Sequence, residues 1–167
     1  TALIDYKAKC KEAKKNKQPM PAIPNYIGEC FMKIAEGLSH KPNFINYTYR
    51  DEMISDGIEN CLMYFDNFNP EKSKNPFAYF TQIIYYAFHR RISKEEKARY
   101  IIYKKFQESV LDTTDASLMI DADDNHLISS TMYDNLNEFI KKFEGREAEK
   151  KEKRKQVKQG LDNFIEE

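Results

Sequence analysis

Hydrophobic residues recur at helical spacing along most of this chain of 167 residues. Where the spacing holds, it predicts amphipathic helices separated by short polar or proline-containing connections. The expected helices cover residues 1–17, 25–38, 48–65, 76 to about 106, and 127–143. The pattern predicts an all-α fold, with a compact helical domain followed by a flexible, charged C-terminal arm.

The fourth expected helix has the clearest start. Asn75 is suited to cap it, and Pro76 fits the first helical position, where a missing N–H costs nothing. The helix either continues through Phe106 or breaks near Ser93. At 100° per residue, one face forms the expected core stripe. That stripe consists of Phe77, Phe80, Ile84, Ala87 and Phe88.

A second face of the same helix combines rings with cations. Residues 75–106 hold nine of the 22 aromatic residues, and residues 77–106 carry seven Lys/Arg against two Glu. The face contains Tyr79, Ile83, Tyr86 and Arg90, bordered by Gln82, His89 and Lys94. Aromatic rings interleaved with cations are typical of surfaces that stack on unpaired bases and contact phosphates. The alternative is a helix buried all round, with its tyrosine hydroxyls at the rim.

The helix expected over 48–65 has a polar strip opposite its apolar face. Thr48 and Asp51 resemble a capping pair at its start. The strip is made of Glu52, Ser55, Asp56 and Glu59. Such a strip is either a solvated face or a docking surface, and periodicity does not separate the two.

Charge is strongly segregated, although the total is zero. Residues 107–126 are acidic without a helical stripe, which predicts a mobile linker. Residues 144–159 are charged on every side and predict a solvated spacer. The chain then ends in GLDNFIEE over residues 160–167, where Leu161, Phe164 and Ile165 form a short hydrophobic tail that needs a partner.

The sequence gives no sign of catalysis. The three histidines are isolated, the three cysteines form no paired motif, and the five glycines include no phosphate-binding loop. We therefore expect no enzyme activity, no metal and no cofactor. An unpaired cysteine set, charged first residues and no apolar run of membrane length predict a cytosolic protein without a membrane segment.

From Glu52 to Ile92 the sequence resembles region two of the sigma-70 family of transcription initiation factors. The segment EMISDGIENCLMYFDNF is similar to the polymerase-docking segment of that family. The promoter-melting pattern Y-x-T-x-x-I-x-x-A-x-x-R-x-I is matched farther on, by Tyr79, Thr81, Ile84, Ala87, Arg90 and Ile92. The match covers about two fifths of the chain, and its spacing over 41 residues is more specific than either motif alone.

The resemblance implies binding partners rather than a catalysed reaction. It assigns binding of the host RNA polymerase core, at the coiled coil of the beta-prime subunit, to Glu52, Ser55, Asp56, Glu59 and Leu62. It assigns recognition and melting of a −10-like A·T-rich promoter to the face that runs from Tyr79 to Lys94. In place of the usual helix-turn-helix module the chain has a spacer and a hydrophobic tail, as in the late-transcription sigma factors of T-even-type bacteriophages.

Membership of that group implies that Leu161, Phe164 and Ile165 bind the phage sliding clamp, with a co-activator as a further partner. The chain would act as a monomer in the cytoplasm of the infected bacterial host. One departure concerns the tryptophan pair of most sigma-70 members, which is replaced by Gln82 and Ile83. Tyr79 and Tyr86 are the expected substitutes beside the first unpaired base.

The corresponding domain organisation is a region-two-like domain over 1–106, an acidic linker over 107–126, a helix over 127–143, a spacer over 144–159 and the tail over 160–167. Two other readings stay open. One is a helical adaptor or anti-sigma-like regulator that binds polymerase without reading DNA. The other is a helical scaffold whose aromatic helix belongs wholly to the core.

Overall fold

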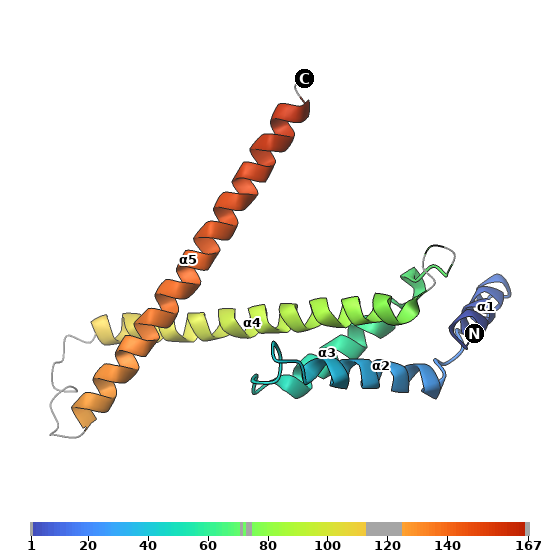
Figure 1. Cartoon of the computed structure of the whole chain (residues 1–167), viewed down its shortest axis with the longest axis horizontal. Helices are drawn as coiled ribbons and strands as arrows, with labels where there is room; N and C mark the ends of the chain where they lie inside the picture. Colours follow the sequence, from blue (N-terminus) through green and yellow to red (C-terminus); the bar gives the residue numbers. More distant parts are fainter. Residues whose placement is uncertain (1, 71, 73–74, 113–124, 166–167) are drawn as a thin grey trace. The chain divides into compact units, whose positions relative to one another are not determined.

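The computed structural model describes residues 2–70, 72, 75–112 and 125–165, with side chains for 2–70, 72, 75–108 and 131–157. Its elements are α1 (Ala2–Lys15), α2 (Asn25–Ser39), α3 (Arg50–Met63), the 3₁₀ turn η1 (Phe65–Asn67), α4 (Pro76–Asp112) and α5 (Asn125–Ile165) (Figure 1). The described residues contain no strand, which confirms the all-α prediction. The chain divides into two units, residues 1–94 and 95–167.

The first unit is built on rings contributed by α2, η1 and the first part of α4. Phe31 of α2 lies 4.6 Å from Phe80 of α4, centroid to centroid, and Phe65 of η1 lies 5.9 Å from the same ring. Phe68, which follows η1, adds a further contact to Phe80 at 5.9 Å. These rings come from elements far apart in sequence, so their burial fixes how the helices pack.

Helices α3 and α4 cross where α3 has no side chain. A Cβ added at Gly57 would lie 3.0 Å from Ile84 Cγ2 and 3.2 Å from Phe88 Cε1. Ile84 and Phe88 are fully buried, so neither has room to move aside. Gly57 is therefore what allows the two helices to approach closely.

Helix α1 docks on the turn η1 through one tyrosine and one lysine. The Tyr6 ring lies edge-on to Phe65 at 5.3 Å, and its hydroxyl donates to the Pro21 carbonyl at 2.9 Å. Burial, followed by contact with Cys10, raises the pKa of Tyr6 to about 12. Lys7 Nζ donates to the carbonyl oxygens of Asp66 and Phe68.

The starts of two helices test the predicted caps. Asn75 Oδ1 accepts the backbone N–H of Ala78 at 3.1 Å, which confirms the cap of α4. The capping pair at Thr48 was wrong, because α3 is preceded by Tyr49 and has no side-chain cap. Tyr49 packs against the core, so burial rather than a local hydrogen bond sets where α3 begins.

The predicted core stripe of α4 is correct except at its first member. Phe80, Ile84, Ala87 and Phe88 are buried, whereas 63% of Phe77 is exposed. Phe77 lies in the first turn of α4, and Phe65 and Phe68 already surround the neighbouring Phe80. The angular position of Phe77 was therefore right for a core residue, but none of the described residues buries it at that height of the helix.

The second unit contains residues 95–112 of α4 and all of α5, which run antiparallel. Tyr100 stacks on Phe143 at 4.5 Å, Tyr103 meets Phe139 edge-on at 5.3 Å, and Gln107 Nε2 donates to Asn137 Oδ1 at 2.8 Å. On the inner side of α5, Leu136 and Ile140 are buried.

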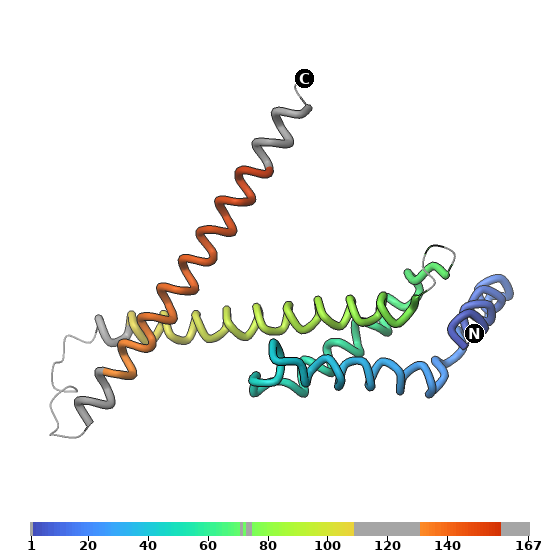
Figure 2. Tube along the Cα trace, viewed as in Figure 1, coloured from blue at the N-terminus to red at the C-terminus, as the bar shows by residue number. Residues whose placement is uncertain are grey.

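The lengths of these two helices correct the expected boundaries. Residues 107–112 belong to α4 rather than to a linker, and the helix does not break near Ser93. The predicted helix over 127–143 and the spacer after it form one helix, which Figure 2 traces to the part drawn in grey. The contacts of α5 extend α4 beyond the point where its own apolar stripe ends. The rest of the expected linker, residues 113–124, lies outside the described residues.

Substituting leucine at two glycines tests the helix crossing. Gly57→Leu should lower the free energy of unfolding by about 1–3 kcal/mol, as overpacking does in a filled core. Gly37→Leu is the matched control, because a Cβ at Gly37 of α2 meets nothing within 4 Å. It should raise stability by up to about 1 kcal/mol through helix propensity. Urea unfolding measures both, and equal effects would contradict the close crossing.

Candidate nucleic-acid interface

Five of the predicted DNA-binding residues are exposed along one side of α4. They are Gln82, Tyr86, His89, Arg90 and Lys94. About half of Tyr86 is exposed, at 52%. Tyr86, His89, Arg90 and Ser93 line a shallow open hollow. A ring with a free face, next to cations on a rigid helix, has the components for stacking on a base and contacting its phosphate.

The other two predicted DNA-binding residues on this face lie against the core. The Tyr79 ring is 5.2 Å from both Phe68 and Phe80, and Tyr79 and Ile83 are half-buried and packed on the core cluster. The second face of α4 is therefore divided. Tyr79 and Ile83 are packed on the core, as expected if the helix were buried all round. From Tyr86 onward the predicted DNA-binding side chains are exposed to solvent.

Two ring residues near this surface were not singled out by sequence reasoning. Phe44, in the connection between α2 and α3, is buried and lies 5.7 Å from Tyr85 and 5.5 Å from His89. Tyr85 also contacts His89 edge-on at 4.4 Å. The available signal was a phenylalanine within the turn-forming segment KPNFIN, where solvated loops seldom place a large apolar residue. Phe44 therefore packs under Tyr85 and His89, which lie beside the exposed surface of α4.

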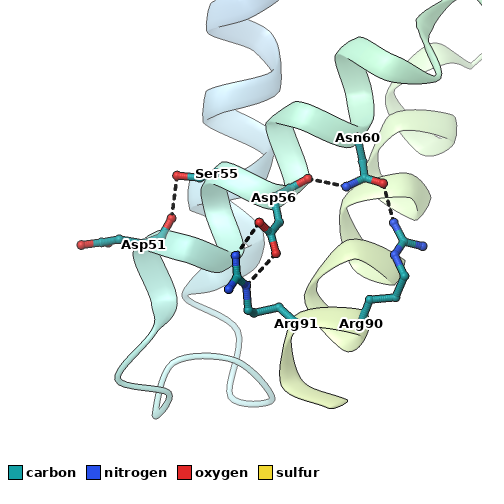
Figure 3. Close-up of polar contacts among 6 residues, drawn as sticks. All are labelled: Asp51, Ser55, Asp56, Asn60, Arg90 and Arg91. Atoms are coloured by element: carbon teal, nitrogen blue, oxygen red, sulfur yellow. Dashed lines mark hydrogen bonds and ion pairs between the residues drawn. The ribbon is translucent and has the colours of Figure 1, made fainter. Parts of the chain in front are cut away.

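Two polar residues of α3, Asp56 and Asn60, bind two arginines of α4 (Figure 3). Arg91 holds Asp56 through two bonds, from Nε to Oδ2 and from Nη2 to Oδ1, each 2.7 Å long. Asn60 Nδ2 donates to the Asp56 carbonyl at 2.7 Å, and Arg90 Nη2 donates to Asn60 Oδ1 at 2.6 Å. We call Asp56, Asn60, Arg90 and Arg91 the arginine clamp.

The clamp changes the role expected of Asp56. Its carboxylate is engaged by Arg91, and only 27% of its side chain is exposed. A bidentate arginine–carboxylate pair of this kind fixes both side chains in one geometry. Arg90 is likewise held in place by Asn60 rather than extended freely into solvent. Asp56 is thus a structural partner of α4 within this unit, although it belongs to the predicted docking strip.

The remaining members of the docking strip are exposed. Glu52, Ser55, Glu59 and Leu62 all face solvent, and Ser55 Oγ donates to the Asp51 carbonyl at 3.0 Å. Beyond Leu62 (43% exposed), Met63 and Tyr64 are also exposed, at 63% and 42%. The strip therefore ends in an exposed apolar edge formed by Leu62, Met63 and Tyr64. Of these three residues, only Leu62 was predicted from the sequence.

Side-chain chemistry in the described part of the chain offers no metal or thiol centre. No group of three His, Cys, Asp or Glu residues among the described residues has metal-binding geometry. Burial raises the pKa of Cys61 to about 12, so its sulfur stays a protonated thiol at neutral pH. Among the described residues, no helix combines the length and apolarity that crossing a membrane requires. The side chains of Leu161, Phe164 and Ile165 lie outside the described set.

Comparison with known proteins adds no family. A scan against models of protein families finds no match, and a search of curated proteins finds none either.

The two tyrosines of the divided face should respond differently to truncation. Tyr79→Ala should lower the free energy of unfolding by about 1–3 kcal/mol, because it removes a ring packed on Phe68 and Phe80. Tyr86→Ala should change it by less than about 0.5 kcal/mol, as is usual for an exposed side chain. Thermal and urea unfolding of both variants provide the comparison. A large loss for Tyr86→Ala would place that ring in the core.

Proposed function

We propose that this chain is a sigma factor for phage late genes. It binds the host RNA polymerase core, recognises and helps to melt a −10-like A·T-rich late promoter, and couples to the replication sliding clamp through residues 160–167. The observation that carries the proposal is the exposed group of Tyr86, His89, Arg90 and Lys94 on α4, all but Lys94 within the 41-residue motif spacing.

These side chains stand on a rigidly supported helix. This favours binding of an unpaired DNA strand in one geometry over unspecific attraction between charges. α3 approaches α4 closely at Gly57 and holds Arg90 through Asn60, so little ordering is needed when a nucleic acid arrives. Stacking on an exposed tyrosine contributes on the order of 1–3 kcal/mol per base. That is enough to offset much of the cost of opening a weak A·T step. Because Tyr79 is packed on the core, Tyr86 is the main candidate for the unpaired base.

Polymerase docking fits the exposed strip of α3. Glu52 and Glu59 would steer the domain to a basic surface, and Leu62 with its apolar neighbours would supply the buried contact. Asp56 contributes indirectly, by holding Arg91 and thereby α4.

A second candidate function has one specific observation in its favour. Tyr79 and Ile83 are half-buried, as expected of a helix that does not read DNA. A polymerase-binding adaptor or anti-sigma-like regulator would need only the α3 strip. Such a protein would give the polymerase no salt-dependent affinity for fork-junction DNA.

Charge reversal at two exposed positions tests docking without disturbing the arginine clamp. Glu52→Lys with Glu59→Lys should weaken binding to core polymerase by about tenfold or more. Asp56 is left intact, because a lysine facing Arg91 would destabilise the domain itself. Glu12→Lys with Glu29→Lys, on α1 and α2, changes the charge equally and should bind normally. Titration against labelled core gives the affinities, and equal binding by both variants would exclude the strip.

Initiation on a template with a TATAAATA element tests the function as a whole. With core polymerase present, Tyr86→Ala should reduce open-complex formation while core binding persists, because a stacking face is lost. Arg90→Ala should mainly weaken fork-junction binding and lower its salt dependence, because a phosphate contact is lost. Permanganate footprinting and anisotropy report these two effects. If the unaltered chain does not initiate transcription with core polymerase, the sigma-factor proposal is contradicted and the adaptor function remains.

The same assay includes a control for the tail. A chain lacking residues 160–167 should retain basal initiation and thermal stability but lose stimulation by the clamp, since a short apolar peptide docks independently of the domain. Full stimulation of the truncated chain would remove the tail from the proposal.

A further inference from the structure

The distal part of α5 is a helix without an apolar face. Between residues 144 and 157 the only apolar side chains larger than glycine are Ala148 and Val157. Every residue from 148 to 157 is exposed, and 64% of Val157 is accessible. This segment therefore contributes nothing to a core, and its role must depend on charge.

Three of the four cations between residues 131 and 150 of α5 have carboxylate partners. Lys142 pairs with Glu138 at 2.7 Å, Arg146 with Glu96 at 3.2 Å, and Lys150 with Glu147 at 2.8 Å. Each of these three cations is therefore compensated by a neighbouring carboxylate. Farther along, residues 151–155 contain Lys151, Lys153, Arg154 and Lys155 against Glu152 alone.

Three of these cations share one face. Lys151, Arg154 and Lys155 stand at i, i+3 and i+4, the spacing of neighbours on a helix surface. Within the described part of the chain, no carboxylate lies in ion-pairing distance of any of the three. The sequence continues the spacing at Lys158. We call Lys151, Arg154 and Lys155 the cationic stripe.

The surrounding field is positive. The pKa of Glu147 is lowered, first by the hydrogen bond from Lys150 and then by the charges of Lys150, Arg154 and Lys151. The charges of the cationic stripe therefore act on the carboxylate of Glu147, one to two helical turns away. The carboxylate of Glu147 on that face is already paired with Lys150, so an external polyanion would meet the same positive potential.

The absence of apolar side chains selects the partner. A helix that lies on a membrane needs an apolar face to insert, and this segment lacks one. A specific protein interface needs anchors that become desolvated, such as aromatic residues, and none occurs here. Duplex DNA needs neither, since it offers one negative charge per roughly 1.7 Å of axis. Cations distributed over about 6 Å of helix can oppose its phosphates in any register.

We propose that the cationic stripe binds the phosphate backbone of duplex DNA without regard to sequence. The proposal does not rest on the sigma-factor function, because it concerns α5 alone and non-promoter DNA. Binding at such a surface releases counterions, so the affinity falls steeply as salt is added.

Neutralising the stripe tests the proposal directly. Lys151→Gln, Arg154→Gln and Lys155→Gln are combined in the full chain, since glutamine preserves helix propensity. Fluorescence anisotropy with a short mixed-sequence duplex is measured across a salt series. The variant should bind at least about tenfold more weakly at low salt, and its slope of log affinity against log salt should become shallower by about 2–3.

A matched variant separates the stripe from net charge. Lys9, Lys11 and Lys15 are exposed on α1, and changing all three to glutamine alters the total charge equally. This control should keep the slope within about 1 of the unaltered chain. In the opposite direction, Glu152→Gln should tighten binding, because it removes the one carboxylate among residues 151–155.

Three outcomes would overturn the proposal. The first is an unchanged slope in the stripe variant while circular dichroism shows that its helix is intact. The second is an equal loss in the α1 control, which would reduce the effect to net charge. The third is equally strong binding of polyglutamate or of vesicles rich in anionic lipid, which would assign the stripe to another partner. The binding experiment contains neither polymerase nor promoter DNA. Its outcome is therefore independent of whether the sigma-factor proposal holds.

Discussion

The contact that organises the first unit is the approach of α3 to α4 at Gly57. A methyl group at this position would already press on Ile84 and Phe88, both without free volume around them. The missing side chain brings the two backbones together and places the polar residues on either side of Gly57 within reach of the α4 arginines. Without that proximity, Asp56 and Asn60 would be out of reach of Arg91 and Arg90, and the part of α4 that carries Tyr86 would lose this contact with α3.

The arginine clamp at this crossing is better explained by geometry than by stability. A partly buried ion pair gains attraction and loses hydration in similar amounts, so its net contribution is small. Its bidentate form nevertheless allows one rotation and one register of α4 against α3. That register determines which rings of α4 are packed on Phe68 and Phe80 and which remain available at the surface.

The second unit relies on a different balance. Stacked rings and the buried Leu136 and Ile140 hold α4 against α5 over a few turns. Between residues 148 and 157 α5 continues with exposed side chains, most of them charged. Its hydrogen bonds are satisfied within the helix, so no packing partner is required for the backbone. The result is a long helix whose proximal face is structural and whose distal face is purely electrostatic.

The sequence by itself determined what depends on local periodicity. Helical spacing located the five α-helices of the described residues and the buried positions Phe80, Ile84, Ala87 and Phe88, because these follow from a repeat of 3.6 residues. The Asn75 cap follows from a nearby hydrogen bond. The exposed ends of the docking strip, Glu52 and Glu59, follow from the same repeat.

Only the tertiary structure decided what depends on the neighbours of each face. Phe44 and Tyr79 are packed because rings from other elements meet them, whereas no ring among the described residues covers Phe77, which is exposed. Asp56 faces an arginine 35 residues away, a pairing that no local pattern encodes. The packing of residues 100–107 of α4 on residues 137–144 of α5 also depends on rings that are distant in sequence. Periodicity specifies an angle around a helix axis, and burial also requires another element at that angle and height.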